Sequence, residues 1–283
     1  MERAPTPYPD LNAVLSELVE SVRAILGDTF VGAYLQGSFA LGDFDAHSDV
    51  DFIIATEDDP STREVDALQA MHGRIFSLES GWAQHLEGSY FPRRYLRRGA
   101  DGRGRDWIDR HAASGGGLWY LDNGRRSLTQ SGHCDTLLVR WTLRERGVTL
   151  AGPAPATLVD PIPAKALRQE ILEVIRSWGQ EIQAHPEQYT SHWDQSYMVL
   201  SFCRALHDLQ SGYPGSKRAG AEWVKANLDP SWAGLIDRSW SGRPVPEEAI
   251  HRPADPEELR ASRAFVRYIV EEANAYASAN HLD

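Results

Sequence analysis

Apolar residues spaced three and four positions apart predict an amphipathic helix over residues 10–27. The positions that share this apolar face are Leu11, Val14, Leu15, Leu18, Val22 and Ile25. Gly27 follows as a helix stop, and strands are expected over residues 30–36 and at the apolar run 52–55. Ser61 and Glu64 form a capping-box motif that begins another apolar-faced helix. This order of strand, turn, strand and helix indicates an α/β core.

The next stretch continues this alternation of strands and helices. Residues 83–91 have the pattern of a strand that contains Glu87, and residues 118–121 that of a short strand or hairpin edge before a turn at 122–124. Residues 135–146 have the pattern of a helix that ends at Gly147. Between these elements lies an arginine-rich segment, residues 92–118, for which a solvated loop is favoured over a lid that binds phosphate.

Two prolines, Pro161 and Pro163, interrupt both helix and strand patterns and indicate a domain boundary. Beyond them, the apolar periodicity is helical throughout, with helices expected around 167–178, 197–205, 217–227, 231–239 and 256–278. The expected fold class is therefore α+β. Residues 1–158 form a mixed sheet with helices, and residues 159–283 form an all-α domain.

Composition narrows the range of partners. The chain has 283 residues, of which 42% are hydrophobic and 24% charged, and such a length favours two domains. A formal net charge of -11 argues against nucleic acid as a partner and suits a cationic substrate. Cys134 and Cys203 provide neither a disulfide framework nor metal-ligand spacing. Because the sequence shows no signal core and no long apolar run, we expect a cytoplasmic protein with no membrane partner. We also expect it to be a monomer.

Two carboxylates, Asp49 and Asp51, stand at the start of the strand predicted at 52–55. Side chains alternate along a strand, so these two point to the same side. Parallel carboxylates suit Mg²⁺, which is commonly held by one or two carboxylates together with substrate phosphates. A solvated turn is the alternative, but charges beside a buried strand are usually paired or bound to metal.

Gly37 and Ser38, which precede these carboxylates, are interpreted as a tight turn. Glycine allows the backbone to approach a phosphate closely, and the hydroxyl and amide groups can donate to phosphate oxygens. A plain loop is the alternative. Glu87 would join Asp49 and Asp51 if its strand pairs beside theirs, where it could bind the metal or take a proton from an attacking hydroxyl. Exposure of Glu87 to solvent is equally compatible with the strand pattern alone.

A Gly-Ser pair at 37–38, a short spacer and Asp49-Val50-Asp51 on a strand together resemble the nucleotidyltransferase superfamily, which has a polymerase-beta-like fold. The rest of the chain resembles the aminoglycoside adenylyltransferases that modify streptomycin and spectinomycin. This resemblance implies ATP as co-substrate and Mg²⁺ as cofactor. It also implies that Glu87 is the catalytic base and that Ser48 and Asp135 belong to the nucleotide site. A capping role at a helix start is the alternative for Asp135.

The helical half carries the strongest part of this resemblance. Arg204 and Lys217 match an arginine and a lysine that contact ATP phosphates in the family, although a structural ion pair is the alternative for Arg204. Asp194 matches a substrate-binding acid, and Trp178 resembles an aromatic residue that stacks on streptomycin. The chain departs from the family in a longer span between Trp178 and Asp194 and in its arginine-rich segment.

The expected function is transfer of AMP from ATP to a hydroxyl group of an aminoglycoside or aminocyclitol. A nucleotidyltransferase that acts on a protein or an RNA is one alternative, and the acidic composition argues against RNA. A nucleotide sensor without catalysis is another, because fold alone does not determine function. The presence of Glu87 beside two metal-binding candidates argues against a sensor, which needs no base.

Overall fold

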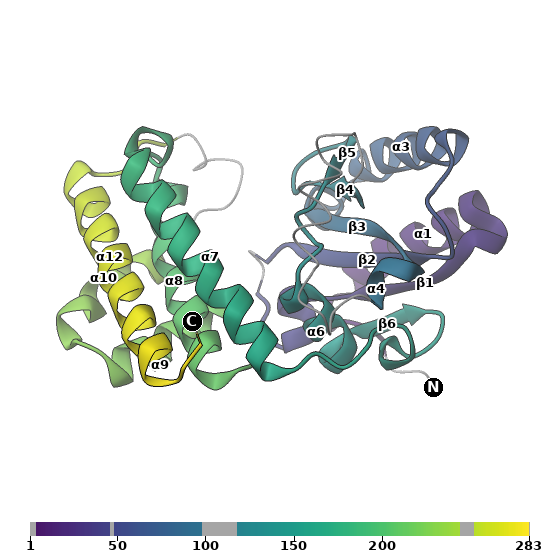
Figure 1. Ribbon diagram of the computed structural model, residues 1–283. Coiled ribbons are helices and arrows are strands. Elements are labelled where there is room, and N and C mark those ends of the chain that lie inside the picture. The colour runs from purple at the N-terminus through teal and green to yellow at the C-terminus, as the bar shows by residue number, and fades with distance from the viewer. Residues whose placement is uncertain (1–3, 46–47, 98–117, 244–251, 283) are drawn as a thin grey trace. The chain divides into compact units, whose positions relative to one another are not determined.

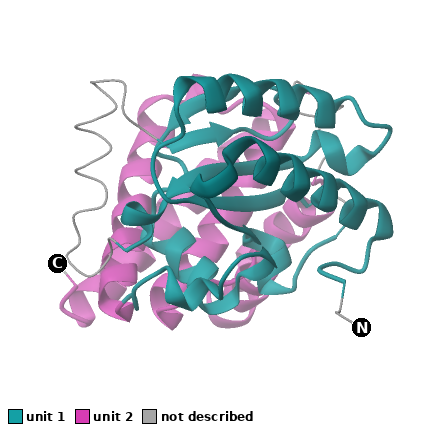
Figure 2. Ribbon diagram, turned by 90° about the vertical axis from the view of Figure 1, so that its right-hand side faces the viewer, with its two compact units in different colours: residues 1–162 teal, residues 163–283 magenta. Residues whose placement is uncertain are grey.

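The computed structural model describes residues 4–45, 48–97, 118–243 and 252–282. The chain divides into two compact units, Met1–Ile162 and Pro163–Asp283 (Figure 2). The division lies within the proline-containing segment that indicated a boundary, a few residues beyond the position at 158/159 expected from the sequence. The two units are described separately below.

Within the described part of the first unit, six strands form one mixed sheet in the order β5-β4-β3-β2-β1-β6. The strands are β1 (Phe30–Leu35), β2 (Val50–Thr56), β3 (Leu86–Pro92), β4 (Leu118–Leu121), β5 (Leu128–Ser131) and β6 (Val148–Ala151). β2 and β3 pair in parallel, and the other neighbours are antiparallel (Figure 1). The mixed sheet with helices predicted for this half is confirmed, whereas β6 was not predicted as a strand.

The helices of this unit are α1 (Pro9–Leu26), α2 (Gly37–Leu41), α3 (Thr62–Phe76), α4 (Arg93–Leu96) and α6 (Leu137–Arg146). Short 3-10 turns cover Gly27–Thr29, Gly81–Gln84 and Pro155–Thr157. α1 ends before Gly27, as its apolar pattern predicts. The capping box at the start of α3 is formed, because Glu64 N–H donates to the Ser61 hydroxyl and the Glu64 carboxylate accepts from Ser61 N–H.

Alternation along the strands divides the interior of this unit between the two faces of the sheet. One face packs with α1 and α3 in a single apolar cluster that contains Leu35, Phe52 and Ile54. The intervening residues, such as Ile53 and Phe91, are also buried and point to the opposite face. A sheet covered on both faces holds its strand ends rigidly, which favours a site built there.

The second unit is all-α in its described part, as the periodicity predicted. Its helices are α7 (Ala164–Ala184), α8 (His192–Ser211), α9 (Lys217–Asn227), α10 (Ala233–Ser241) and α12 (Pro256–Ala279), with 3-10 turns at Pro186–Gln188 and Pro230–Trp232. α8 packs against α7, α9, α10 and α12 and supplies core residues such as Phe202 and Leu206. None of the helices in the described residues combines the length and apolar character needed to cross a membrane.

Candidate active site

Asp51 and Glu87 are direct partners in the register of the parallel strands β2 and β3. The two strands lie side by side in the middle of the sheet (Figure 1). Residues paired in this way present their side chains on the same face, so the two carboxylates are neighbours. The hypothesis for Glu87 required that its strand pair beside the strand of Asp51, and this pairing is confirmed. The alternative, an isolated Glu87 that faces solvent, does not agree with it.

Glu87 lies in an enclosed and strongly acidic environment. Only 15% of its side chain is exposed, and its Oε1 accepts a hydrogen bond from the Tyr120 hydroxyl at 2.6 Å. The pKa of Glu87 is raised to about 8, first by burial and then by the negative charge of Asp51, while the Tyr120 hydrogen bond opposes the shift and Asp49 adds to it. A carboxylate that binds a proton this readily suits a general base near neutral pH.

Asp49 precedes β2 and is oriented by the hairpin turn that follows β4. Its Oδ1 accepts a hydrogen bond from Asn123 Nδ2 at 2.5 Å. The turn itself is anchored by Gly124 N–H, which donates to the Gln84 carbonyl at 3.1 Å. Tyr120 and Asn123 thus support two of the candidate carboxylates, although sequence reasoning assigned them only to a strand edge and a turn. Their role depends on the pairing of β3 with β4, which no local motif encodes.

Gly37 and Ser38 begin the short helix α2 rather than forming the tight turn that we expected. Gly37 has a φ of +58°, and a Cβ placed there would lie 2.0 Å from Asp51 Oδ2. Glycine is therefore needed so that the Asp51 carboxylate can lie against this backbone. The Ser38 hydroxyl is buried and has no hydrogen-bond partner among the described residues, which leaves it available to a ligand.

Ser48 stabilises the loop before Asp49. Its hydroxyl accepts a hydrogen bond from Asp45 N–H at 2.9 Å, and its own N–H donates to the Asp45 carbonyl at 3.1 Å. These contacts keep the loop compact next to the first carboxylate. A direct contact between Ser48 and a nucleotide stays a prediction.

No group of three or more His, Cys, Asp or Glu side chains in the described residues is arranged to hold a metal ion. Binding of a metal ion by all three carboxylates stays a prediction, and Glu87 Oε1 accepts a hydrogen bond from the Tyr120 hydroxyl. Asp49 and Asp51 remain compatible with Mg²⁺, because this ion takes one or two protein carboxylates and completes its shell with water and phosphate oxygens. The two carboxylates also raise the pKa of Glu87, a repulsion that a bound cation would relieve.

Asp135 differs from its prediction in its local structure. It lies before α6, whose N-cap is Thr136, and not in the first helical turn. Its carboxylate forms a buried ion pair with Arg140, whose side chain is 1% exposed and whose guanidinium also donates to the Tyr95 carbonyl at 3.1 Å. The Asp135 carboxylate thus has a structural partner in Arg140. Its place in a nucleotide site stays a prediction.

Arg204 and Lys217 lie on neighbouring helices of the second unit. A Cβ on Gly220 would lie 2.5 Å from Arg204 Cα, so α9 approaches α8 closely at this point. Lys217 stands one turn earlier, as the first residue of α9, and its Nζ lies 4.6 Å from the centroid of the Tyr197 ring on α8. The fold of this unit therefore places both cations along one helix pair.

The two residues predicted to bind the acceptor also lie on neighbouring helices of this unit. Trp178 on α7 stacks on Phe202 at a centroid distance of 4.8 Å, and its Nε1 donates to the Tyr189 hydroxyl at 3.3 Å. Asp194 on α8 completes a capping box, in which its Oδ2 accepts from Ser191 N–H at 2.9 Å. Both residues thus have structural partners, and their contact with an acceptor stays a prediction.

The arginine-rich segment is described only in part. Arg93 pairs with Glu57, and Arg94 pairs with Asp59. The choice between a loop and a lid concerns mainly residues 98–117, which lie outside the described residues.

Comparison with known proteins gives matches to both halves of the chain. Residues 15–87 match the nucleotidyltransferase domain family, and residues 157–271 match the C-terminal domain of aminoglycoside adenylyltransferase. An aminoglycoside (3'') (9) adenylyltransferase from Shigella flexneri is 23% identical over 92% of this chain and 94% of its own length. A protein of the same name from Klebsiella pneumoniae is 24% identical over 90% of this chain and 92% of its own length.

A solved structure has the same fold over nearly the whole chain. It is the spectinomycin adenyltransferase AAD(9) from Enterococcus faecialis, determined with ATP and spectinomycin. The TM-score is 0.64 with 13% identity, over 93% of this chain and 98% of that one. Residues 15–87 thus match a nucleotidyltransferase domain, which agrees with the resemblance that the residues at 37–51 predicted. The helical half matches more narrowly the C-terminal domain of aminoglycoside adenylyltransferase, and the chain is similar to such enzymes over nearly its whole length.

Proposed function

We propose that the protein transfers an adenylyl group from ATP to a hydroxyl group of a cationic aminoglycoside or aminocyclitol, with streptomycin and spectinomycin as the first candidates. The observation that carries this proposal is the pairing of Asp51 with Glu87, which sets a metal-binding candidate beside a carboxylate that readily takes a proton. The names of the relatives, and the ATP and spectinomycin bound to the structural neighbour, support the choice of substrates.

Asp49 and Asp51 are the residues that would hold Mg²⁺. When bound, this ion neutralises charge on the reacting phosphate and the leaving pyrophosphate. Gly37 lets the backbone approach closely, and the buried Ser38 hydroxyl is a donor without a partner among the described residues. We assign Gly37 and Ser38 to binding of the terminal phosphates, since an unpaired buried donor is satisfied by an anionic oxygen.

Glu87 accepts the proton of the attacking hydroxyl. The acceptor oxygen then forms a bond to the α-phosphorus of ATP as the bond from that phosphorus to pyrophosphate breaks. The Tyr120 hydroxyl holds Glu87 Oε1 in place at 2.6 Å. Such an oriented base contributes about 10²–10⁴-fold to a rate.

Arg204 and Lys217 neutralise the pyrophosphate that leaves. Arginine donates through a planar fork and lysine acts as a point charge, and both suit phosphate oxygens. Asp194 contributes a negative charge and Trp178 an aromatic surface for the cationic acceptor. The formal net charge of -11 favours the approach of such a molecule.

The test is an assay of the purified protein with Mg²⁺, labelled ATP and a panel of aminoglycosides and aminocyclitols. We expect pyrophosphate release that requires an acceptor, together with an acceptor that has gained AMP by mass spectrometry. Growth of cells that express the gene on streptomycin or spectinomycin plates is the matching test in vivo. Tight ATP binding without turnover on any acceptor would contradict the proposal and favour a nucleotide sensor, whereas labelled protein or RNA would favour the other alternative.

A further inference from the structure

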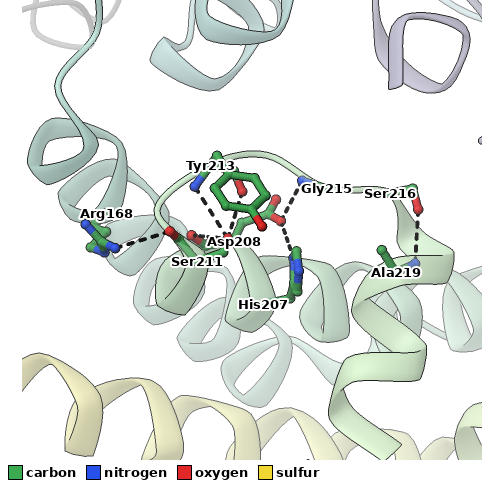
Figure 3. Close-up of polar contacts among 8 residues, drawn as sticks. All are labelled: Arg168, His207, Asp208, Ser211, Tyr213, Gly215, Ser216 and Ala219. Carbon is green, nitrogen blue, oxygen red and sulfur yellow. Dashed lines mark hydrogen bonds and ion pairs between the residues drawn. The ribbon is translucent and has the colours of Figure 1, made fainter. Parts of the chain in front are cut away.

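A buried carboxylate, Asp208, lies beneath the turn that joins α8 to α9. Its side chain is 1% exposed, and its Oδ1 accepts a hydrogen bond from Gly215 N–H at 2.8 Å and lies 2.9 Å from Nδ1 of His207. Figure 3 shows the carboxylate between these two groups, with the turn passing over it. Burying a carboxylate is unfavourable unless it is paired, so these partners determine how Asp208 can be accommodated.

The turn over residues 212–216 is tied to α8 at both of its ends. At its start, the Ser211 hydroxyl donates to the Tyr213 carbonyl at 3.0 Å, and Gly212 ends α8 in the left-handed conformation. At its end, a Cβ on Gly215 would lie 2.8 Å from His207 Cε1, so glycine allows the backbone to reach the carboxylate. The Asp208 carboxylate is thus the contact that fixes the end of the turn.

α9 begins directly after this contact. The Ser216 hydroxyl caps the helix by accepting from Ala219 N–H at 3.0 Å, and Lys217 is the first helical residue. Since Gly215 precedes Lys217 by two residues, the position of the Gly215 backbone determines where the lysine Cα lies. The Lys217 ammonium is then held near the Tyr197 ring.

Asp208 is also linked to the other candidate phosphate-binding cation. Arg204 stands one turn earlier on α8, on the same side of the helix. Burial raises the pKa of Asp208, and the hydrogen bond with His207 and the positive charge of Arg204 oppose that rise. Asp208 Oδ2 has no hydrogen-bond partner among the described residues. A neutral acceptor would satisfy Gly215 equally well, so what a charged residue adds at this position is its interaction with Arg204 and His207.

We propose that Asp208 is a positioning residue for the nucleotide phosphates, which fixes the start of α9 and thereby the place of Lys217 relative to Arg204. This inference rests on the proposed function, because it assigns phosphate binding to Lys217 and Arg204. Asp208 itself does not contact the nucleotide. It acts through the Gly215 backbone and through its charge.

The test is a calorimetric titration of the full-length protein with ATP and Mg²⁺. The proteins compared are the wild type, Asp208→Ala, Asp208→Asn, Lys217→Ala and the double variant Asp208→Ala/Lys217→Ala. If Asp208 acts through Lys217, each alanine replacement weakens ATP binding by about tenfold or more, and the double variant binds no more weakly than Lys217→Ala alone. Asp208→Asn keeps an acceptor for Gly215 but loses the charge, so we expect its ATP affinity to lie between those of the wild type and Asp208→Ala.

A matched control separates positioning from general loss of stability. Ser239→Ala removes a fully buried hydroxyl that accepts from Gln195 Nε2 at 3.0 Å near the opposite end of α8. This control should lower the melting temperature and leave ATP affinity unchanged. An Asp208→Ala protein that behaves like the control, or a double variant with additive losses, would overturn the proposal.

The remaining outcomes distinguish failure of the role of Asp208 from failure of the proposed function. Suppose that the wild type binds ATP and that Lys217→Ala binds it poorly. Normal ATP binding by Asp208→Ala would then overturn the role of Asp208 and leave the proposed function intact. A wild type that fails to bind ATP would contradict the proposed function, and the role of Asp208 would be overturned with it. Should Asp208→Ala not fold, Asp208→Asn carries the test, and an affinity equal to that of the wild type would contradict the proposal.

Discussion

Asp51 and Glu87 face each other across the parallel pair β2 and β3. The negative charge of Asp51 adds to burial in raising the pKa of Glu87 to about 8. Two acidic residues side by side are unfavourable for folding alone, since each disfavours the ionised form of the other. Their pairing is the feature of the first unit that is most readily explained by function, and the contacts around it can be tested one at a time.

Replacing Tyr120 by Phe should shift the pH dependence of catalysis. The Tyr120 hydroxyl lowers the pKa of Glu87 by donating to it, so its loss raises that pKa further. A hydrogen bond to a charged group contributes about 1.5–3 kcal/mol, which corresponds to about one pKa unit or more. Because the base acts when deprotonated, kcat/KM at pH 7 should fall about tenfold and recover at higher pH. Tyr90→Phe, which removes a buried hydroxyl bonded to His72, is the control and should not shift the profile.

Replacing Glu87 by Gln should change stability in a pH-dependent way. The pKa of Glu87 in the folded protein lies above its ordinary value of 4.5, so folding favours the protonated carboxyl. The resulting contribution to stability is complete below about pH 4.5 and is lost as the pH rises through about 8. Without metal or nucleotide, the melting temperature of Glu87→Gln should therefore rise relative to the wild type between these pH values. A difference that stays constant with pH would contradict the burial and repulsion described for Glu87.

Replacing Gly37 by Ala should abolish turnover through Asp51. A Cβ at this position would lie 2.0 Å from Asp51 Oδ2, and the φ of +58° is unfavourable for alanine. Gly42→Ala is a matched control, because Gly42 has a φ of +74° but a Cβ there would meet no atom of the described residues within 4 Å. Both variants should lose about 1–2 kcal/mol of stability from backbone strain. Only Gly37→Ala should lose activity, and equal activities would contradict the contact with Asp51.

Removing the Asp135 carboxylate should destabilise the first unit. Arg140 would be left buried without its ionic partner, and breaking a buried pair in this way costs about 3–5 kcal/mol. Asp59→Ala breaks an ion pair with Arg94 whose side chains are 62% and 39% exposed, and it should cost no more than about 1 kcal/mol. Denaturant unfolding of both variants measures the difference. Equal losses would show that the Asp135–Arg140 pair is not the buried contact described.

Much of the candidate site could be proposed from the sequence, because the patterns that indicate Asp49 and Asp51 are local. Alternation placed Asp49 and Asp51 on one side of a strand, and the apolar run of residues 52–55 indicated a buried neighbour. Glu87 could be proposed as a site residue, but its position relative to Asp49 and Asp51 could not be predicted. The pattern of one strand does not reveal which other strand pairs with it. The register of β2 with β3 supplies that information.

The residues missed from the sequence depend on long-range pairing. Tyr120 and Asn123 reach the carboxylates only because β4, which lies far from β3 in the sequence, pairs with it. β6 was missed because apolar and polar positions alternate only weakly along its four residues. These residues form a strand by pairing with β1. Asp135 was assigned to a helix start, whereas Thr136 caps α6 and Asp135 turns inward to Arg140. For Tyr120, Asn123 and β6 the decisive contacts are tertiary ones that no local pattern encodes.

The most direct test is acceptor-dependent transfer of AMP from ATP under single-turnover conditions, with ATP affinity measured in parallel. For Glu87→Gln we predict a rate about 10²–10⁴-fold below that of the wild type and nearly unchanged ATP affinity, because only the base is lost. For Asp51→Asn we predict a loss of rate accompanied by weaker binding of ATP with Mg²⁺. Transfer at the wild-type rate by either variant would contradict the catalytic pairing of Asp51 with Glu87.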